Sequence, residues 1–285
     1  MKFVSFTAQG RRSFGVVVGA GVHDLGARLG AVVPDLKTYL HALSLGMHFA
    51  DPSGTTDFAA GEFGYDPVIP SPTKILCVGH NYEEHRRETE RAPTAYPSIF
   101  GRFADTLIGH EASIVRPAVS QALDYEGELA VIVGRPGWRV PKDNALALVA
   151  GYTVANEASV RDWQRHTIQF TPGKNFLGTC PLGPALVTPD EVDGLDHRAI
   201  TTTLNGQVVQ KAVLGDMIFS IAEIIAYVSA FTPLAPGDVI VTGTPGGVGF
   251  KREPQLFMKP GDIVEVAVEG IGHLRNGVVD ETGTT

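Results

Sequence analysis

Short apolar runs separated by turn-forming residues dominate the hydrophobic pattern of this chain. Its 33 glycines and 19 prolines lie between short Val- and Ile-rich segments, a pattern typical of many short strands joined by tight turns. We therefore predict a strand-rich α+β fold and not a helical bundle. Strands are expected near residues 2–7 and 14–20, and a helix over residues 36–45.

A proline-rich stretch at 61–72 predicts a domain boundary. It carries three prolines in its last six residues, so it should be extended and unable to continue a helix. We expect a small N-terminal α+β domain over residues 1–70 and a larger domain over residues 71–285. The larger domain should open with a buried strand at 74–79, after which Asn81 is suited to cap a helix running to about residue 91.

Three further patterns predict elements of the larger domain. Residues 151–155 read as a strand that leads into a short helix through 159–166. Ser220 and Glu223 have the spacing of a capping box ahead of the clearest amphipathic helix in the chain. Two Pro-Gly-Asp turns, at 236–238 and 260–262, each precede a Val- and Ile-rich strand.

Composition and charge exclude several classes of protein. The chain has a formal net charge of −8 with acids and bases well mixed, which argues against a nucleic-acid partner. No apolar run is long enough to span a bilayer, and the polar start is unlike a secretory signal, so we expect a cytoplasmic protein. The two cysteines, Cys77 and Cys180, make no disulfide framework and are interpreted as reduced packing residues.

Glu126 and Glu128 are the most informative pair of residues in the chain. They precede and enter a predicted buried strand, and because strand side chains alternate, both carboxylates should point to one side. Two like charges on an apolar face need a cation or hydrogen-bond donors, and a hard divalent metal is the natural ligand. A solvated pair at a strand end is the alternative, and for an isolated Glu-x-Glu it is the more frequent one.

Two polar clusters could join such a site. His85 and Glu88 are three residues apart on one helical face, where the carboxylate would orient the imidazole as a general base; the alternative is a solvated surface helix. Glu157 lies between a strand end and a helix start, with Arg161 and Gln164 one turn apart. They could be a metal ligand and two donors, or an ordinary helix start on the surface.

Two loop segments are less specific. Lys174 lies in a turn-like setting where a lysine is ordinarily exposed, so it matters only if the fold brings it to the metal. The glycine-rich segment 242–249 lacks the ending of a P-loop and the spacing of a dinucleotide motif. Its backbone N–H groups could meet a small carboxylate, or it is simply a tight turn.

Taken together and in this order, these segments resemble the fumarylacetoacetate hydrolase family. The resemblance covers residues 74 to about 270, nearly the whole larger domain. Its motifs are CVGHNY at 77–82 followed by His85 and Glu88, DYEGE at 124–128, GYTVANE at 151–157, SVRDWQ at 159–164, GKNF at 173–176, LNG at 204–206 and VTGTPGGVG at 241–249.

The resemblance implies a mixed β-roll catalytic domain, usually a homodimer, that binds Mg²⁺ or Mn²⁺ through Glu126, Glu128 and Glu157. The third ligand is commonly aspartate in the family, so Glu157 adds one methylene of reach. A second departure is His80, where relatives often carry arginine. The resemblance further implies catalytic roles for His85, Glu88 and Lys174, and substrate binding by the following residues: Arg161, Gln164, Tyr82, Arg102, Gly243 and Thr244.

The activity that this resemblance implies is hydrolysis. The substrate would be a 2,4-dioxo acid of the acylpyruvate type, cleaved between C3 and C4 to pyruvate and a carboxylic acid in the catabolism of aromatic compounds or sugars. An isomerase, decarboxylase, hydratase or dehydratase acting on a 2-oxo acid would use the same enolate chemistry, and a non-catalytic metal- or metabolite-binding protein is a further alternative. The pairing of His85 with Glu88 favours hydrolysis, because that dyad activates water.

Overall fold

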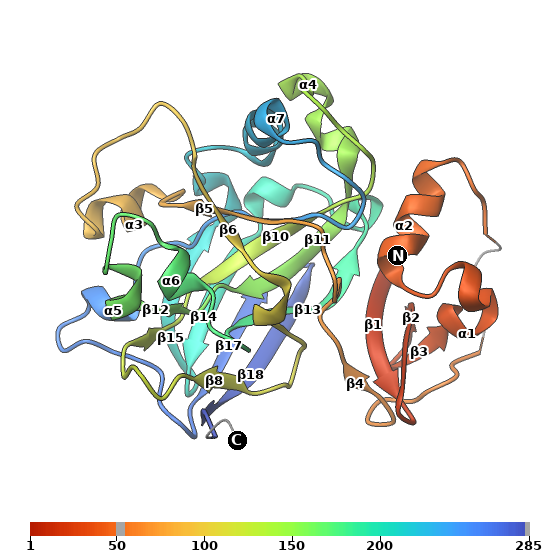
Figure 1. Cartoon of the computed structure of the whole chain (residues 1–285), viewed down its shortest axis with the longest axis horizontal. Coiled ribbons are helices and arrows are strands. Elements are labelled where there is room, and N and C mark those ends of the chain that lie inside the picture. Colours follow the sequence, from red (N-terminus) through yellow and green to blue (C-terminus); the bar gives the residue numbers. More distant parts are fainter. Residues whose placement is uncertain (50–54, 283–285) are drawn as a thin grey trace.

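One large sheet forms the centre of the molecule, and the computed structural model describes residues 1–49 and 55–282 (Figure 1). The strand-rich α+β architecture is as predicted. The order along this sheet is β3 (Gly21–Asp24), β2 (Arg11–Val18), β1 (Lys2–Ala8), β13 (Cys180–Val187), β11 (Val149–Asn156), β10 (Gly127–Val133), β16 (Val239–Val241), β5 (Ile75–Gly79) and β6 (Ser98–Arg102). At its margins β4 (Gly64–Tyr65) pairs with β1, and β7 (Leu107–Ile108) pairs with β13.

A second sheet packs against the centre of the first. Its order is β15 (Gln207–Val213), β14 (Ala199–Leu204), β17 (Ile263–Val268), β18 (Gly272–Asp280) and β8 (Ile114–Arg116), and a separate two-stranded ribbon joins β9 (Leu123–Asp124) to β12 (Ser159–Val160). The buried side chains of Leu129 and Val131 on β10 share one core with Ile200 and Val266 of the second sheet. This shared core holds β10 rigidly, which matters because β10 carries part of the site.

The N-terminal strands continue the main sheet. Strand β1 pairs with β13, with Phe3 opposite Leu186, and α1 (Leu25–Leu29) and α2 (Leu36–Ser44) pack on this end of the sheet (Figure 1). Leu36 belongs to the same buried cluster as Leu182 and Leu186. The boundary between residues 70 and 71 stays a prediction, and both the sheet and its core continue across it.

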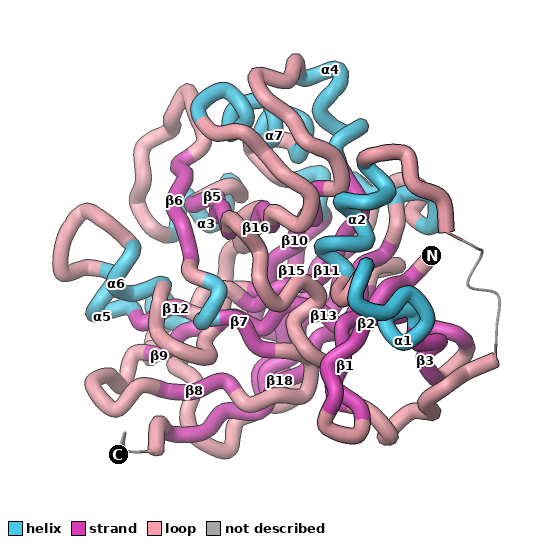
Figure 2. Tube along the Cα trace, turned by 45° about the vertical axis from the view of Figure 1, so that its right-hand side comes forward, coloured by secondary structure: helices cyan, strands magenta, loops and turns pink. Residues whose placement is uncertain are grey.

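Short helices gather at the opposite end of the molecule. Figure 1 and Figure 2 show α5 (Arg161–Gln164) and α6 (Thr171–Lys174) side by side there, with α3 (Glu83–Glu88) on the same side of the molecule. The remaining helices are α4 (Lys142–Ala145), α7 (Ile221–Phe231) and the 3-10 turns Gly30–Val32, Ala104–Thr106, Leu146–Leu148, Pro189–Glu191, Leu195–His197, Leu214–Asp216 and Gly249–Lys251. Within the described ranges, none of the helices has the length and apolar character that a membrane span requires.

Two predicted helices differ from the observed ones. The helix after β5 begins at Glu83 with Tyr82 as its N-cap and ends at Glu88. Asn81 does not cap it, because its side-chain amide donates to the carbonyls of Phe219 and Thr242, at 3.0 and 2.8 Å. This side chain therefore joins three segments of the chain.

The other difference concerns residues 159–166. Here the chain first forms the two residues of β12, with Ser159 opposite Asp124, and only then the single turn of α5. The backbone N–H and C=O groups of these residues pair with β9 and are therefore not available for the hydrogen bonds of a longer helix. The capping box at Ser220 and Glu223 is confirmed at the start of α7.

Candidate active site

Three glutamates converge at one end of the two central strands. Each of Glu126, Glu128 and Glu157 offers a carboxylate oxygen within 4.8 Å of the others, and all three side chains are buried. Alternation along β10 places Glu126 and Glu128 on one side. The antiparallel register of β10 with β11 adds Glu157, whose N–H donates to the Glu126 carbonyl at 2.8 Å. Two neighbouring strands thus position the whole triad.

Two buried cations bridge the triad to its surroundings. The Lys174 ammonium contacts Glu126 and lies 2.9 Å from an oxygen of Glu157. The Arg161 guanidinium lies 2.7 Å from Glu126 through Nη2 and 2.8 Å from Asp124 through Nε. Both cations come from the short helices α5 and α6, so the fold brings Lys174 to the acidic cluster despite its turn-like sequence.

A third buried cation, Arg102, lies behind Glu157. Its Nη1 is 3.4 Å from a Glu157 oxygen and donates to the Ala158 carbonyl at 3.1 Å, while Nη2 donates to the Thr179 hydroxyl at 2.8 Å. These contacts fix the guanidinium within the protein wall. Arg102 therefore orients Glu157 from behind and does not line the cavity in front of it.

Glu128 has the least compensation of the three glutamates. Its one hydrogen-bond donor in the described chain is the N–H of Gly243. Burial, followed by the charges of Glu157 and Glu126, raises its pKa well above the ordinary value. Burial also opposes ionisation of Glu126, but Arg161 and Lys174 outweigh it and lower the pKa of that carboxyl.

The charge balance of the cluster fits a divalent metal. Four buried carboxylates, including Asp124, face the three buried cations Arg102, Arg161 and Lys174, so the cluster has one negative charge in excess when all four carboxylates are ionised, as a bound metal would require. An all-oxygen donor set of clustered carboxylates is the kind that Mg²⁺ and Mn²⁺ prefer. The residues present therefore fit the metal that the sequence predicts.

The histidine–carboxylate dyad forms a second polar wall. Nδ1 of His85 lies 2.7 Å from Oε1 of Glu88, whose other oxygen accepts a hydrogen bond from the Gly247 N–H at 3.0 Å. With Nδ1–H donating to the carboxylate, Nε2 is the nitrogen left to accept a proton. The dyad is thus geometrically formed, with Glu88 fixed from both sides.

His80 stacks on this dyad. Its ring lies 5.4 Å from the His85 ring with an interplanar angle of 13°. Burial, followed by the charges of His85 and Arg91, lowers the pKa of His80 to about 4. His80 is therefore neutral near pH 7, and it supports the His85 ring without adding charge.

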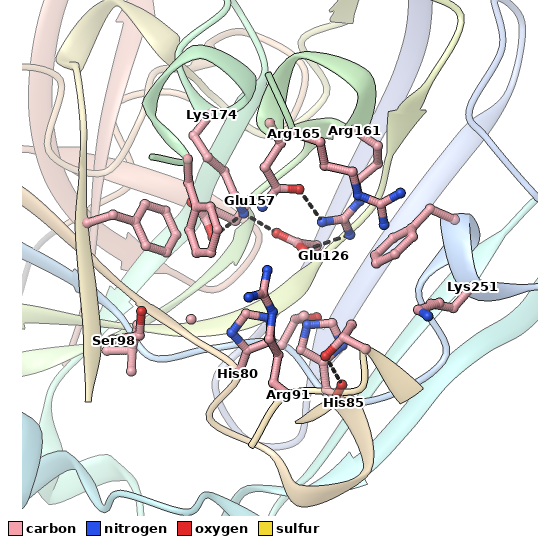
Figure 3. A pocket seen from close by; sticks show the side chains of 18 of the residues that line it. His80, His85, Arg91, Ser98, Glu126, Glu157, Arg161, Arg165, Lys174 and Lys251 are labelled. Atoms are coloured by element: carbon pink, nitrogen blue, oxygen red, sulfur yellow. Dashed lines mark hydrogen bonds and ion pairs between the residues drawn. The ribbon is translucent and has the colours of Figure 1, made fainter. Parts of the chain in front are cut away.

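A cavity of about 540 Å³ lies between these two walls (Figure 3). Most of the predicted site residues line it: Glu126, Glu128, Glu157, His85, Arg161, Gln164, Lys174 and Thr244. Glu88, Arg102 and Gly243 lie one layer behind and touch residues that do. The Tyr82 side chain is buried outside this cavity, beside Pro245 and Gly246, because residue 82 forms a bridge to Met217; the structure does not bring it to the predicted substrate.

Backbone N–H groups of the glycine-rich segment 242–249 donate hydrogen bonds to carboxylates of the protein itself. Backbone N–H groups of Gly243, Gly247 and Gly249 donate to Glu128, Glu88 and Asp124, respectively. Gly243 and Gly247 have φ values of 108° and 97°, which residues with a Cβ rarely adopt. Three of the N–H groups that the sequence suggested for a bound carboxylate therefore bind carboxylates of the protein itself.

Several residues of the site were not among those predicted. Asp124 and Ser159 lie within the quoted motifs, and Ser159 Oγ is 2.9 Å from a Glu126 oxygen, so their polar character was a usable signal. His80 also lies within a quoted motif and lines the cavity. The others come from loops and strand faces without a distinctive pattern, and they too line the cavity: Arg91, Phe100, Arg165, Phe170 and Phe250.

A strand-rich α+β fold, an all-oxygen metal site and a histidine–carboxylate dyad on one cavity together define a divalent-metal-dependent enzyme. Comparison with known families agrees with this class. The model of the fumarylacetoacetate (FAA) hydrolase C-terminal family matches residues 74–279, and the chain belongs to this family.

Individual relatives extend the comparison. The chain is 44% identical over 213 residues to the mitochondrial oxaloacetate tautomerase FAHD2A of Bos taurus and equally to that of Homo sapiens, with 74% of this chain and 68% of the relative covered. The structure resembles the fumarylacetoacetate hydrolase of Exiguobacterium antarcticum, with 33% identity, a TM-score of 0.87 and coverage of 99% and 100%. It also resembles the maleylpyruvate hydrolase of Sphingobium sp. SYK-6 in complex with manganese(II) and pyruvate, with 26% identity, a TM-score of 0.82 and the same coverage.

Proposed function

We propose that the protein is a Mg²⁺- or Mn²⁺-dependent enzyme that moves a proton at C3 of a 2-oxo acid and interconverts the keto and enol forms of an oxaloacetate-type substrate. The observation that carries this proposal is that the carboxylate triad and the His85–Glu88 dyad face the same cavity. The tautomerase names of relatives 44% identical to this chain support the choice of reaction.

The triad is the part of the site that would hold the metal. Glu126, Glu128 and Glu157 would bind it, and the bound ion would polarise the carboxylate and 2-oxo oxygens of the substrate as a Lewis acid. Arg161 and Lys174 would stay paired with Glu126. They keep that carboxylate ionised and oriented while the metal binds.

The proton transfer itself falls to His85. Nε2 would take a proton from C3, and the Glu88 carboxylate on Nδ1 would stabilise the imidazolium that results. The 2-oxo oxygen gains negative charge as the C3–H bond breaks, and the His85 imidazolium would then give the proton to this oxygen, which ends as the enol hydroxyl while His85 returns to its neutral form. Lys174 and the pair Arg161–Gln164, joined by a 3.0 Å hydrogen bond, would face that oxygen, each donor contributing roughly a few kcal/mol.

Hydrolysis of a 2,4-dioxo acid is the second candidate function. The cavity of about 540 Å³ is larger than a four-carbon acid needs, and the dyad suits the activation of water. His85 would take a proton from water as the hydroxide adds to C4; the C3–C4 bond then breaks, and C3 accepts a proton. The products would be pyruvate and a carboxylic acid.

Two parallel assays separate these candidates. The first follows the decay of enol oxaloacetate by ultraviolet absorbance with Mg²⁺ or Mn²⁺ present, and the second measures pyruvate release from acetylpyruvate and longer 2,4-dioxo acids. Metal-dependent acceleration of the first reaction alone supports the tautomerase, and stoichiometric pyruvate in the second supports the hydrolase. Metal binding without acceleration of either reaction would contradict both and leave a non-catalytic binding protein. Size-exclusion chromatography with light scattering would check the predicted homodimer.

A further inference from the structure

Two solvent-exposed arginines, Arg91 and Arg165, line the cavity. The guanidinium groups of Arg91 and Arg165 make no ion pair or side-chain hydrogen bond with any residue in 1–49 or 55–282. In Figure 3 Arg91 reaches in from the side opposite Arg161 and Arg165. An arginine that faces a cavity from each of two walls is the arrangement that holds a carboxylate between planar donors.

The backbone at Arg91 has two connections to its surroundings, while its guanidinium makes no ion pair with the residues that the structure describes. The Arg86 side chain donates to the Arg91 carbonyl, and Arg86 is itself fixed by Glu83, with Nη2 to Oε1 at 2.6 Å. An ion pair of 3.0 Å between Glu90 and Lys251 ties the same turn to the segment that follows the glycine-rich loop. These contacts connect the turn that carries Arg91 to α3 and to the segment after the glycine-rich loop.

Arg165 is positioned by an aromatic ring. Its guanidinium carbon lies 4.4 Å from the centre of the Phe250 ring, and that of Arg161 lies at the same distance. Burial, followed by the positive charges of Arg161 and Arg91, lowers the pKa of Arg165. The positive charges of Arg91, Arg161 and Arg165 thus lie near one another. Of these, Arg161 is already paired with Asp124 and Glu126.

The charge balance of the site suggests a role for Arg91 and Arg165 in substrate binding. With all four of its carboxylates ionised, the buried cluster carries one excess negative charge; a divalent metal adds two positive charges, and the carboxylate of a simple 2-oxo acid then brings the cluster to neutrality. A substrate with a second carboxylate would leave a negative charge unbalanced inside the cavity. Arg91 and Arg165 offer the compensation that such a substrate needs.

We propose that Arg91 and Arg165 form a subsite for the distal carboxylate of a dicarboxylic 2-oxo acid, so that the enzyme selects diacids over 2-oxo acids with an uncharged tail. This inference rests on the proposed function, because the triad and its metal must bind the 2-oxo end. It names two specificity-determining residues that take no part in the proton transfer.

Calorimetric binding to the Mg²⁺-loaded protein tests this subsite. Three probes are used. Oxalate reaches only the metal end, 2-oxoglutarate also carries a distal carboxylate, and 2-oxopentanoate has a carbon chain of the same length that ends in an uncharged methyl group. In the Arg91→Gln and Arg165→Gln variants, 2-oxoglutarate should bind roughly tenfold to a hundredfold more weakly, as expected for loss of a charge-assisted contact. Oxalate and 2-oxopentanoate should bind as they do to the wild type.

Arg87→Gln is the matched control. Arg87 is an exposed arginine of α3 that pairs with Glu83 and lines none of the cavities described here, so its loss should leave all three affinities unchanged. Equal binding of 2-oxoglutarate by the wild type and both subsite variants, with oxalate still bound, would overturn the subsite and leave the proposed function standing. Failure of oxalate to bind the metal-loaded wild type would overturn the proposed function, and the subsite with it.

Discussion

The two walls of the cavity differ in how firmly the fold holds them. We call the side that carries Glu126, Glu128 and Glu157 the triad wall, and the side that carries His85 and Glu88 the dyad wall. On the triad wall, Glu128 lies within β10, which is paired on both sides, and every residue of that strand is buried. On the dyad wall, His85 and Glu88 lie on a helix of six residues, and Glu84 and Arg87 of that helix are exposed. One wall is part of the core, and the other is an element attached to it.

This difference follows from what each wall must hold. Three like charges repel at short range, so only a scaffold with fixed backbone positions and buried counter-charges keeps them together. A general base needs one imidazole with a defined tautomer, and a single carboxylate contact supplies it. The triad wall should therefore govern metal affinity, and the dyad wall should govern rate.

The largest effect on metal binding is expected from Glu128→Gln on the triad wall. The amide keeps the size of the side chain but removes a carboxylate whose one hydrogen-bond donor among the described residues is the Gly243 N–H. We expect Mn²⁺ affinity, measured by titration calorimetry, to fall by more than roughly a hundredfold, because loss of a ligand exceeds loss of an outer contact. Unchanged affinity would remove Glu128 from the metal site.

His85→Ala should separate the two walls. It removes the base and its contact with Glu88 but no contact with the three triad carboxylates, so turnover with either candidate substrate should fall by roughly 10²- to 10⁴-fold. Mn²⁺ affinity should stay within error of the wild type. A large loss of metal binding in this variant would show that the walls are coupled and would break the comparison.

A smaller effect is expected from Ser159→Ala, again on the triad wall. The Ser159 hydroxyl lies 2.9 Å from Oε2 of Glu126 and helps to orient that carboxylate. Its removal should weaken metal binding by roughly tenfold, with the catalytic rate at saturating metal largely kept. Ser120→Ala, which loses a contact to Asp162 away from the triad, is the matched control and should leave metal affinity unchanged.

The triad wall was the more predictable from the sequence. Alternation along a strand is a strict geometric rule, so Glu126 and Glu128 could be placed on one side before any fold was known. Glu157 required the pairing of β10 with β11, which periodicity does not encode. The register of two strands depends on long-range packing, and only the family resemblance supplied it.

The dyad wall and the cavity lining were less predictable. The three-residue spacing of His85 and Glu88 indicated their contact, but not that the Gly247 N–H holds the second oxygen of Glu88. Asn81 looked like a helix cap, yet its amide binds carbonyls far away in the chain. Arg91 and Arg165 carry no motif, because loop positions acquire meaning only when the fold brings two loops to one cavity.

The smallest effect is expected from Glu83→Gln on the outer face of the dyad wall. Hydrogen bonds from Arg86, then Arg87, lower the pKa of Glu83 to about 2. The folded pKa of Glu83 lies below the ordinary value of 4.5. The stabilisation of α3 by the ionised Glu83 is therefore present above pH 4.5 and is lost as the pH falls toward 2. The Glu83 side chain is 45% exposed, so the change should be local.

Amide hydrogen exchange over α3 is the measurement that resolves this local effect. The Glu83→Gln variant should exchange faster than the wild type at pH 6, and the difference should shrink as the pH falls toward 3. Glu84→Gln, a change at an exposed neighbour without an ion pair to any residue in 1–49 or 55–282, should match the wild type throughout. If α3 exchanged identically in all three proteins at pH 6, the helix would be as firmly held as the strands, and the dyad wall would have to be regarded as part of the core.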